Sequence, residues 1–297
     1  MKDEHLRSDG QKRSFNWFYA VNAAILALAA VTILYPFYNA VLISLVSQKE
    51  YVTTPFMLFP KRITFDAYTY IFSSSRIYTG YFNTLLILLI GVPYNMLATT
   101  FTAYALSRER FPGKRIITAL VVFTMYFSGG LIPLYLLVRD IGLMNQLAAV
   151  ILVYGANTFY LLLMRSYFME IPSALEESAK IDGANDLVIL LRIMLPLSLP
   201  IVATITLFFS VDRWNEWFNA MLFLREGEKW PLQLVLRSIV MSTIDDIGSR
   251  NVSIRKTVFE DGVKMAAVFI TMAPIMFTYP FLQKYFMKGI MVGSVKS

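Results

Sequence analysis

The chain has 297 residues, of which 57% are hydrophobic and 16% charged, and its net charge is +7. Such a composition excludes an ordinary soluble protein, because the polar residues could not cover the apolar core. A lipid bilayer removes this constraint, since side chains that face lipid need no polar coat. We therefore predict a membrane protein.

Several classes of site and partner are excluded as well. The chain has no cysteine and a single histidine, His5, so disulfides and thiolate metal sites are excluded, as is an imidazole base within the membrane. We predict no metal site. The basic residues are scattered at the ends of apolar segments instead of forming a stripe along one helix, which argues against a nucleic-acid partner.

Six intervals of the chain contain no charged residue and are long enough to span a bilayer: 14–48, 77–107, 116–138, 141–164, 193–211 and 265–283. They are continuously apolar, whereas the strands of a membrane barrel alternate in polarity. Isolated strands cannot satisfy their backbone in lipid. We predict an all-α, polytopic fold with six transmembrane helices in one domain, 14–286, between an N-terminal tail, 1–13, and a C-terminal tail, 287–297.

The basic residues orient the predicted helices. Cytoplasmic loops are enriched in Lys and Arg, and two short segments stand out: the N-terminal tail, with Lys2, Arg7, Lys12 and Arg13, and the second loop, with Arg108, Arg110, Lys114 and Arg115. Lys284, Lys288 and Lys296 mark the C-terminal tail in the same way. We predict that both termini are cytoplasmic.

The cytoplasmic loop 165–196 contains signals for two helices. Ser173 followed three residues later by Glu176 is typical of a capping box, and Gly183 is typical of a left-handed helix stop. These signals predict a helix from about 174 to 182. Asn185 can cap a second helix, which Pro196 bends where the chain re-enters the membrane. We predict a helix-turn-helix on the inner surface.

The first of these helices is suited to docking a partner. Ser178 and Ala179 are small enough for close approach, and Glu176, Glu177 and Lys180 place charge around them. The alternative is an interfacial helix that only connects two spans. Composition alone favours the connecting helix slightly, because capping boxes are common.

The spacing of the loop resembles a known motif. Glu177-Ser178-Ala179, three residues, Gly183, nine residues, Ile193, one residue and Leu195-Pro196 resemble the Glu-Ala-Ala loop of ATP-binding-cassette importers, with Ser178 in place of the first Ala. Asp182 and Ala184 also match the sugar importers of that class. Stretches 127–145, 214–217 and 283–296 are similar to maltose-type permeases, especially those that serve polysaccharide-derived oligosaccharides.

This resemblance implies a bacterial inner-membrane complex. Two homologous permeases, expected as a heterodimer, would share one pathway, two ATPase subunits would bind below, and an external solute-binding protein would deliver the sugar. It implies ATPase contact by the loop residues Glu176, Glu177, Ser178, Ala179, Asp182, Gly183, Ala184 and Pro196. The chain has no Gly-rich phosphate loop, so we expect a non-catalytic subunit that binds no cofactor, with ATP and Mg used by the partners.

Candidate residues for the sugar pathway follow the fifth apolar interval. Helical spacing would place polar side chains on one face and aromatic rings on the other. The candidates are Asp212, Asn215, Glu216 and Asn219, together with Trp214 and Trp217, and, in the fourth interval, Tyr154 and Asn157. An interfacial aromatic belt and interhelical hydrogen bonds are the alternatives. Arg213, Arg225 and Arg237 could favour an acidic sugar.

Other functional classes compete with the importer. A secondary transporter would place ionisable residues within its spans for ion coupling, and the six intervals contain none. A channel would need no docking loop, and the loop carboxylates are the only candidates for a membrane enzyme. A secondary transporter or channel not driven by ATP remains the alternative to the importer.

Overall fold

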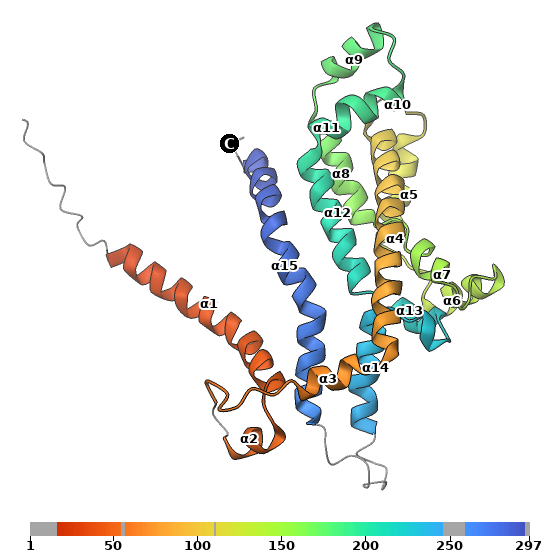
Figure 1. Ribbon diagram of the computed structural model, residues 1–297. Helices are drawn as coiled ribbons and strands as arrows, with labels where there is room; N and C mark the ends of the chain where they lie inside the picture. Colours follow the sequence, from red (N-terminus) through yellow and green to blue (C-terminus); the bar gives the residue numbers. More distant parts are fainter. Residues whose placement is uncertain (1–16, 55–56, 110, 246–258, 295–297) are drawn as a thin grey trace, which may run out of the picture.

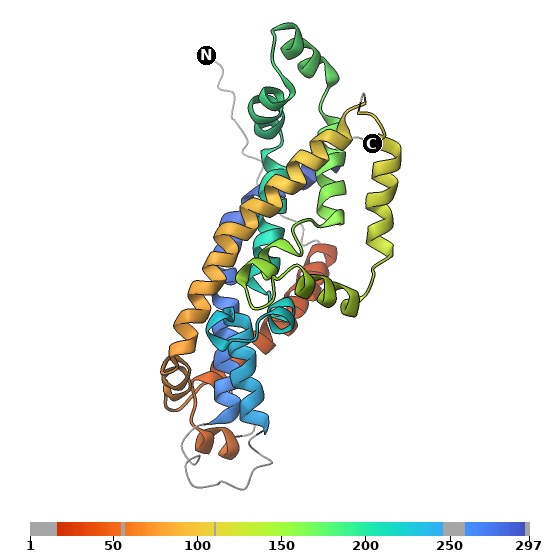
Figure 2. The same ribbon diagram turned by 90° about the vertical axis from the view of Figure 1, so that its right-hand side faces the viewer.

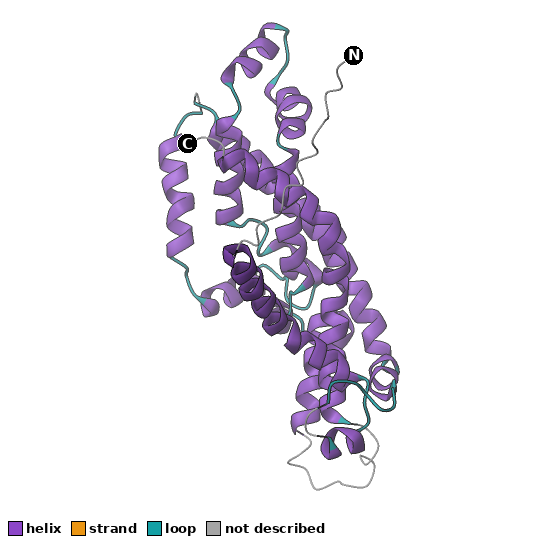
Figure 3. Cartoon of the chain, turned by 90° about the vertical axis from the view of Figure 1, so that its left-hand side faces the viewer, coloured by secondary structure: helices purple, strands orange, loops and turns teal. Residues whose placement is uncertain are grey.

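A computed structural model describes residues 17–54, 57–109, 111–245 and 259–294, and these residues form helices and loops with no strand (Figures 1 and 3). The predicted tail 1–13 lies outside the described residues. The all-α prediction is confirmed for the part of the chain that the structure describes.

Three helices are long and apolar enough to cross a membrane on their own. They are α1, Trp17–Ser44, α4, Ser75–Ser107, and the first 19 residues of α15, which spans Glu260–Ser294. Helix α1 runs away from the other helices and packs on α15 only near its own C-terminal end (Figure 1). Its apolar window is 0% buried, with a mean hydropathy of 2.0. Lipid or another subunit must therefore cover α1.

The interval 116–138 is not one helix, and that prediction is wrong. Helix α5, Lys114–Tyr126, ends before Ser128-Gly129-Gly130, and α6, Leu131–Asp140, leaves at an angle of 112° to it. Gly130 has a φ of 92°, a conformation that glycine adopts at little cost. The paired glycines break a segment whose apolar composition alone suggested continuity.

The interval 141–164 is broken as well, so its prediction as one helix is also wrong. Helix α7, Leu147–Leu152, and α8, Thr158–Glu170, are separated by residues 153–157. The Asn157 side chain accepts hydrogen bonds from the backbone N–H groups of Phe159 (3.0 Å) and Tyr160 (3.2 Å). Asn157 therefore begins α8 as its N-cap.

The loop 165–196 forms the predicted pair of helices. Helix α9, Ser173–Ile181, is followed by a turn at Gly183, whose φ is 82°, and by α10, Asp186–Ile189. The Asn185 side chain caps α10 by accepting from the Val188 N–H at 2.9 Å. Beyond α10 lie the π-helix η1, Leu190–Met194, and α11, Leu195–Leu197, and this segment meets α12, Leu199–Trp214, at 87°.

Shorter elements gather at the end of the molecule opposite α9 (Figures 1 and 2). They are α2, Gln48–Thr53, α3, Asp66–Phe72, α13, Phe218–Phe223, the 3-10 helix η2, Gly227–Lys229, and α14, Leu232–Asp245. Asn145 ties this end together: its Oδ1 accepts from the N–H groups of Arg225 and Glu226, both at 3.2 Å, and its Nδ2 donates to the Glu226 carboxylate at 2.6 Å.

Length and composition give between three and five spans for the described residues, the higher figure if each bent pair is one span. The six-span count therefore stays a prediction. The predicted boundary at 286 is not marked by a break, because α15 continues through it to Ser294.

Helix α4 connects two buried apolar clusters. One joins α3, α4, α14 and α15 and includes Ile71, Ile77 and Leu232. The other joins α4, α8, α12 and the segment after the loop turn, and it includes Phe168 and Met194. The base of the loop is thus part of the core, so the loop is attached firmly to the membrane helices.

Candidate coupling loop and pathway lining

Helix α9 projects beyond the ends of the other helices (Figure 1). Most of the predicted contact residues are exposed: Glu177, Ser178, Asp182 and Gly183 on α9 and the turn after it, and Pro196 farther along the chain in α11. Ala179, Ala184 and Glu176 are partly buried and face the rest of the protein. The apolar residues Leu175 and Ile181 are 44% and 86% exposed. The outward face is therefore a small mixed surface that lacks a partner within the described chain.

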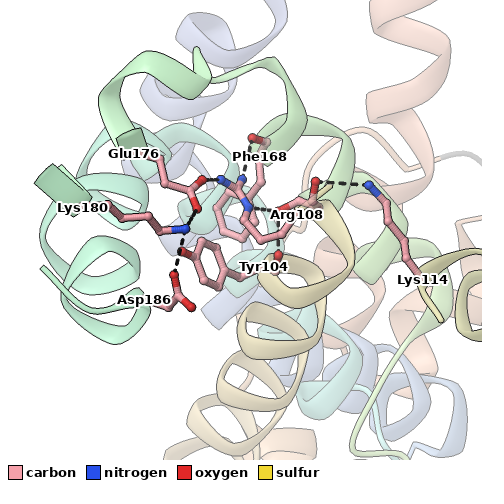
Figure 4. A network of polar contacts seen from close by, with 8 residues as sticks. Tyr104, Arg108, Lys114, Phe168, Glu176, Lys180 and Asp186 are labelled. Carbon is pink, nitrogen blue, oxygen red and sulfur yellow. Dashed lines mark hydrogen bonds and ion pairs between the residues drawn. The ribbon is translucent and has the colours of Figure 1, made fainter. Parts of the chain in front are cut away.

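The inward face of α9 is held by a polar network at the end of α4 (Figure 4). The Glu176 carboxylate pairs with the Arg108 guanidinium and accepts from the Lys180 ammonium at 2.8 Å, and Lys180 also lies 3.3 Å from Asp186. Arg108 donates to the Phe168 carbonyl at 3.3 Å and to the Ser107 hydroxyl at 2.9 Å. We call this network the α9 latch. It fixes the loop to both α4 and α8.

The predicted capping box is wrong. Pro172 is the N-cap of α9, Ser173 is already helical, and no side chain caps the helix N-terminus. Glu176 is drawn instead to Arg108 and Lys180, because a charged hydrogen bond is about twice as strong as a neutral one.

The electrostatics of the α9 latch favour the ionised pair. Burial raises the pKa of the Glu176 carboxyl, but hydrogen bonds and charge from Lys180 and Arg108 outweigh it, so the pKa lies below its ordinary value of 4.5. The hydrogen bond to Glu176 raises the pKa of Lys180. A depressed carboxyl pKa means that this stabilisation is present above pH about 4.5 and is lost as pH falls through the lower, folded-state value.

Replacing Glu176 by Gln is expected to loosen α9 by about 1–2 kcal/mol, since it removes a partly buried charge that pairs with two cations. Amide hydrogen exchange in α9 would then be about 5- to 30-fold faster. Acidification should loosen α9 in the wild type but not in the variant. Glu177→Gln, an exposed carboxylate on the same helix, is the control, and equal loosening by that variant would contradict a specific role for Glu176.

The predicted pathway residues do not lie on one continuous helix. Helix α12 ends at Trp214, and α13 begins only at Phe218, so the two-faced helix over 212–219 is wrong. Trp214 is buried, and its Nε1 donates to the Thr271 carbonyl at 3.0 Å. Its ring therefore packs against α15 and offers no sugar platform. Glu216 accepts from the Asn219 N–H at 3.1 Å in the first turn of α13, whose N-cap is Trp217.

Other predicted residues remain accessible. Asp212 is exposed and accepts from the Tyr160 hydroxyl at 2.9 Å, which joins α12 to α8 close to the cap residue Asn157. Tyr160 was not predicted from the sequence. Tyr154 is 44% exposed, and the Asn215 Oδ1 accepts from Gln233 at 3.2 Å. These exposed side chains carry hydroxyl, amide and carboxylate groups that suit hydrogen bonding to sugar hydroxyls, and they remain candidates for the pathway.

Trp217, another predicted residue, stacks with a cation. The Arg237 guanidinium lies 3.9 Å from the centroid of the Trp217 ring, and Trp217 is partly buried. The guanidinium makes a cation–π contact with one face of the Trp217 ring. That face is therefore not free to stack on a sugar.

Arg213 is not an outer-surface cation, as the sequence suggested, but lies buried at 3% exposure. Its guanidinium donates to the Asn95 Oδ1 at 3.1 and 3.2 Å and to three carbonyls, those of Val150 (2.6 Å), Ile151 (2.9 Å) and Tyr154 (3.0 Å). The carbonyls at the C-terminal end of α7 lack hydrogen-bond partners within the helix, and they carry the negative end of the helix dipole. The Arg213 guanidinium donates hydrogen bonds to these carbonyls, and its positive charge stabilises the negative end of the dipole.

Asn95 completes this cluster, which we call the Arg213 cluster. Its Nδ2 donates to the carbonyls of Tyr154 at 2.9 Å and Gly155 at 2.8 Å. Gly155 is needed there, since a Cβ at this position would lie 2.4 Å from the Tyr94 ring. The cluster fixes the break between α7 and α8 against α4 and α12. The sequence does contain a signal for this cluster: Asn95 lies within an apolar interval, where its amide needs a hydrogen-bond partner on another helix.

Long apolar helices, with one short helix that projects at one end of the bundle, define a polytopic membrane protein. Residues 67–292 match the family described as binding-protein-dependent transport system inner membrane component, and the chain belongs to that family. It is therefore a non-catalytic, multi-pass subunit of an inner-membrane complex. Such systems also contain ATPase subunits and a binding protein.

Relatives and solved structures agree with this assignment. The chain is 41% identical over 278 residues to the polygalacturonan/rhamnogalacturonan transport system permease protein YtcP of Bacillus subtilis, covering 92% of this chain and 95% of that protein. It is 39% identical over 271 residues to the protein LplC of the same organism, covering 91% of each. A chain in the crystal structure of a bacterial ABC transporter involved in the import of the acidic polysaccharide alginate superposes with a TM-score of 0.81 and 33% identity, covering 96% of this chain and 100% of that one.

Proposed function

We propose that the chain forms half of the translocation pathway of an ATP-driven importer of oligosaccharides. The observation that carries the proposal is the position of α9, which projects outward with an exposed face while the α9 latch holds its inward face to the core. A helix held in this way transmits force instead of bending freely. Closure of an ATPase dimer would move it as a lever and rock the spans between inward-open and outward-open states.

The exposed residues of α9 and its turn form the proposed ATPase contact. Glu177, Ser178, Asp182 and Gly183 lie on this surface, where small residues allow close approach and acidic residues meet basic groups of a partner. ATP and Mg would be bound by the ATPase subunits, and this chain would bind no cofactor.

The proposed orientation places α9 in the cytoplasm. The loop after α4 and the end of α15 lie toward the same end of the molecule as α9, and the N-terminal end of α1 points toward that end from its C-terminal end near α2 and α3 (Figures 1 and 2). The basic loop residues support a cytoplasmic assignment for that end. Both termini would then be cytoplasmic. The exposed apolar surface of α1 supports pairing with a second permease, which we propose is a different, homologous chain.

Acidic oligosaccharides, such as uronates, are the proposed cargo, delivered by an extracytoplasmic solute-binding protein. Support comes from relatives whose names specify polygalacturonan and the acidic polysaccharide alginate. Arg213 takes no part, because it is buried among carbonyls. Arg225 and Arg237 at the outer end are exposed, so we propose that their charges face an acidic sugar, although Arg225 donates to the Tyr135 hydroxyl at 3.4 Å and Arg237 stacks on Trp217.

The test is reconstitution of the complex purified from native membranes. We expect ATPase and a binding protein to co-purify, and we expect galacturonate oligosaccharides with that binding protein to stimulate ATP hydrolysis more than neutral oligosaccharides of equal length. Equal stimulation by neutral sugars would refute the proposed acidic cargo but not the importer itself. Absence of a co-purifying ATPase would refute the importer.

A further inference from the structure

A surface groove between α5 and α8 belongs neither to the coupling loop nor to the pathway lining. It is shallow and open, with a volume of about 750 Å³. Ala119, Val122 and Phe123 contribute apolar surface along it, and Lys114, Arg115 and Arg165 lie among its lining residues as well. The groove is thus apolar over its length and basic toward the N-terminus of α5.

The basic charge in the groove is not neutralised within the described part of the chain. Lys114 donates to the Ser107 carbonyl at 3.3 Å and the Arg165 Nε to the Leu106 carbonyl at 3.0 Å, but neither pairs with a carboxylate among the described residues. Arg115 makes no hydrogen bond or ion pair there. Among the residues that the structure describes, no acidic one lines the groove.

The helix dipole adds to this positive charge. Gly113 is the N-cap of α5 and provides no side-chain cap, and the first turn of α5 contains no acidic residue. Positive side chains at a helix N-terminus are unfavourable, whereas an anion there is stabilised by the dipole and the free N–H groups. Charge and dipole therefore both favour an anion at this end of the groove.

The apolar part of the groove is open to the surroundings of the protein. No residue of α5 is buried, and α5 packs chiefly on α8. Figure 2 shows α5 standing away from the remaining long helices. An apolar channel that continues from a cationic end matches a molecule with an anionic head and hydrocarbon chains.

We propose that this groove binds an anionic phospholipid. The phosphate would lie beside Arg115 and Arg165 near the N-terminus of α5, and an acyl chain would follow Ala119, Val122 and Phe123. A bound lipid of this kind would neutralise the cations and fill the gap between α5 and α8. The proposal does not depend on the identity of the cargo.

The test is native mass spectrometry of the purified complex with phosphatidylglycerol or phosphatidylcholine as the probe. We expect preferential retention of phosphatidylglycerol by the wild type. Arg115→Gln and Arg165→Gln should each weaken that retention about fivefold, the expected contribution of one basic residue near anionic lipid. Ala119→Trp should also weaken it, because the ring fills the groove while every cation remains. Arg192→Gln, an exposed basic residue in η1, is the matched control and should retain the lipid.

Four results would overturn the proposal. One is equal retention of the two lipids by the wild type, and another is a similar loss in Arg192→Gln. The third is a partner protein in the groove: because the chain has no other cysteine, Ala119→Cys provides a unique crosslinking site, and efficient crosslinking to the second permease would show that protein covers the groove. Competition by inorganic phosphate as strong as by the lipid would show a free-anion site instead.

Discussion

Replacing Arg213 by Met is expected to destabilise the subunit by about 3–5 kcal/mol, the cost of removing one partner from a buried charged network. Met retains much of the side-chain volume, so the loss comes from polar groups and not from a cavity. The Asn95 Oδ1 and the carbonyls of Val150 and Ile151 would lose their donor in a buried site. The measurement is the thermal midpoint of the purified complex, together with its yield.

Two further variants separate charge from geometry in the Arg213 cluster. Arg213→Lys keeps the charge but cannot reach Asn95 and the carbonyls of α7 at once, so an intermediate midpoint is expected. Arg225→Met removes an exposed arginine near the same end and should leave the midpoint unchanged. A wild-type midpoint in Arg213→Met would show that water or relaxation satisfies these carbonyls and that the cluster does not hold the α7–α8 break.

Local signals in the sequence predicted local structure well. Gly183 and Asn185 act within a few residues of the chain, and the structure places a left-handed turn and a helix cap at these positions. The family followed from the spacing around them. Helices α1 and α4 were predictable for a similar reason. Each lies in an unbroken apolar interval, and a scan for charged residues detects such intervals.

Such local signals do not predict contacts between residues that are far apart in the sequence. The local spacing predicts that Glu176 pairs with Ser173 in a capping box. Its stronger partner in the structure, Arg108, lies 68 positions away in the sequence. Arg213 was taken as a surface cation, although Asn95, 118 positions distant, lies beside it in the fold. The breaks at Gly130 and Asn157 were missed for a different reason, since a scan for charged residues does not register helix-breaking glycines or capping side chains.

Substituting both Glu177 and Gly183 is expected to uncouple ATP hydrolysis from transport, with uptake reduced at least 10-fold while the subunit remains folded. Glu177 is exposed and makes no hydrogen bond within the described chain, so Glu177→Ala should leave stability nearly unchanged and act only on the partner. Gly183 has a φ of 82° and open space around it. Gly183→Val therefore meets no clash, and its cost is the backbone strain that distorts the turn after α9.

The assay compares ATP hydrolysis with sugar uptake in proteoliposomes that contain the whole complex. Loss of a charge from a buried interface costs about 2–5 kcal/mol, so reduced retention of the ATPase subunits is also expected. Ser178→Ala is the matched control on the same face of α9, and it should transport normally because one small side chain replaces another. Wild-type uptake by the double variant would show that α9 is merely a connector between two spans, and the α9 latch would then stabilise the fold without transmitting force.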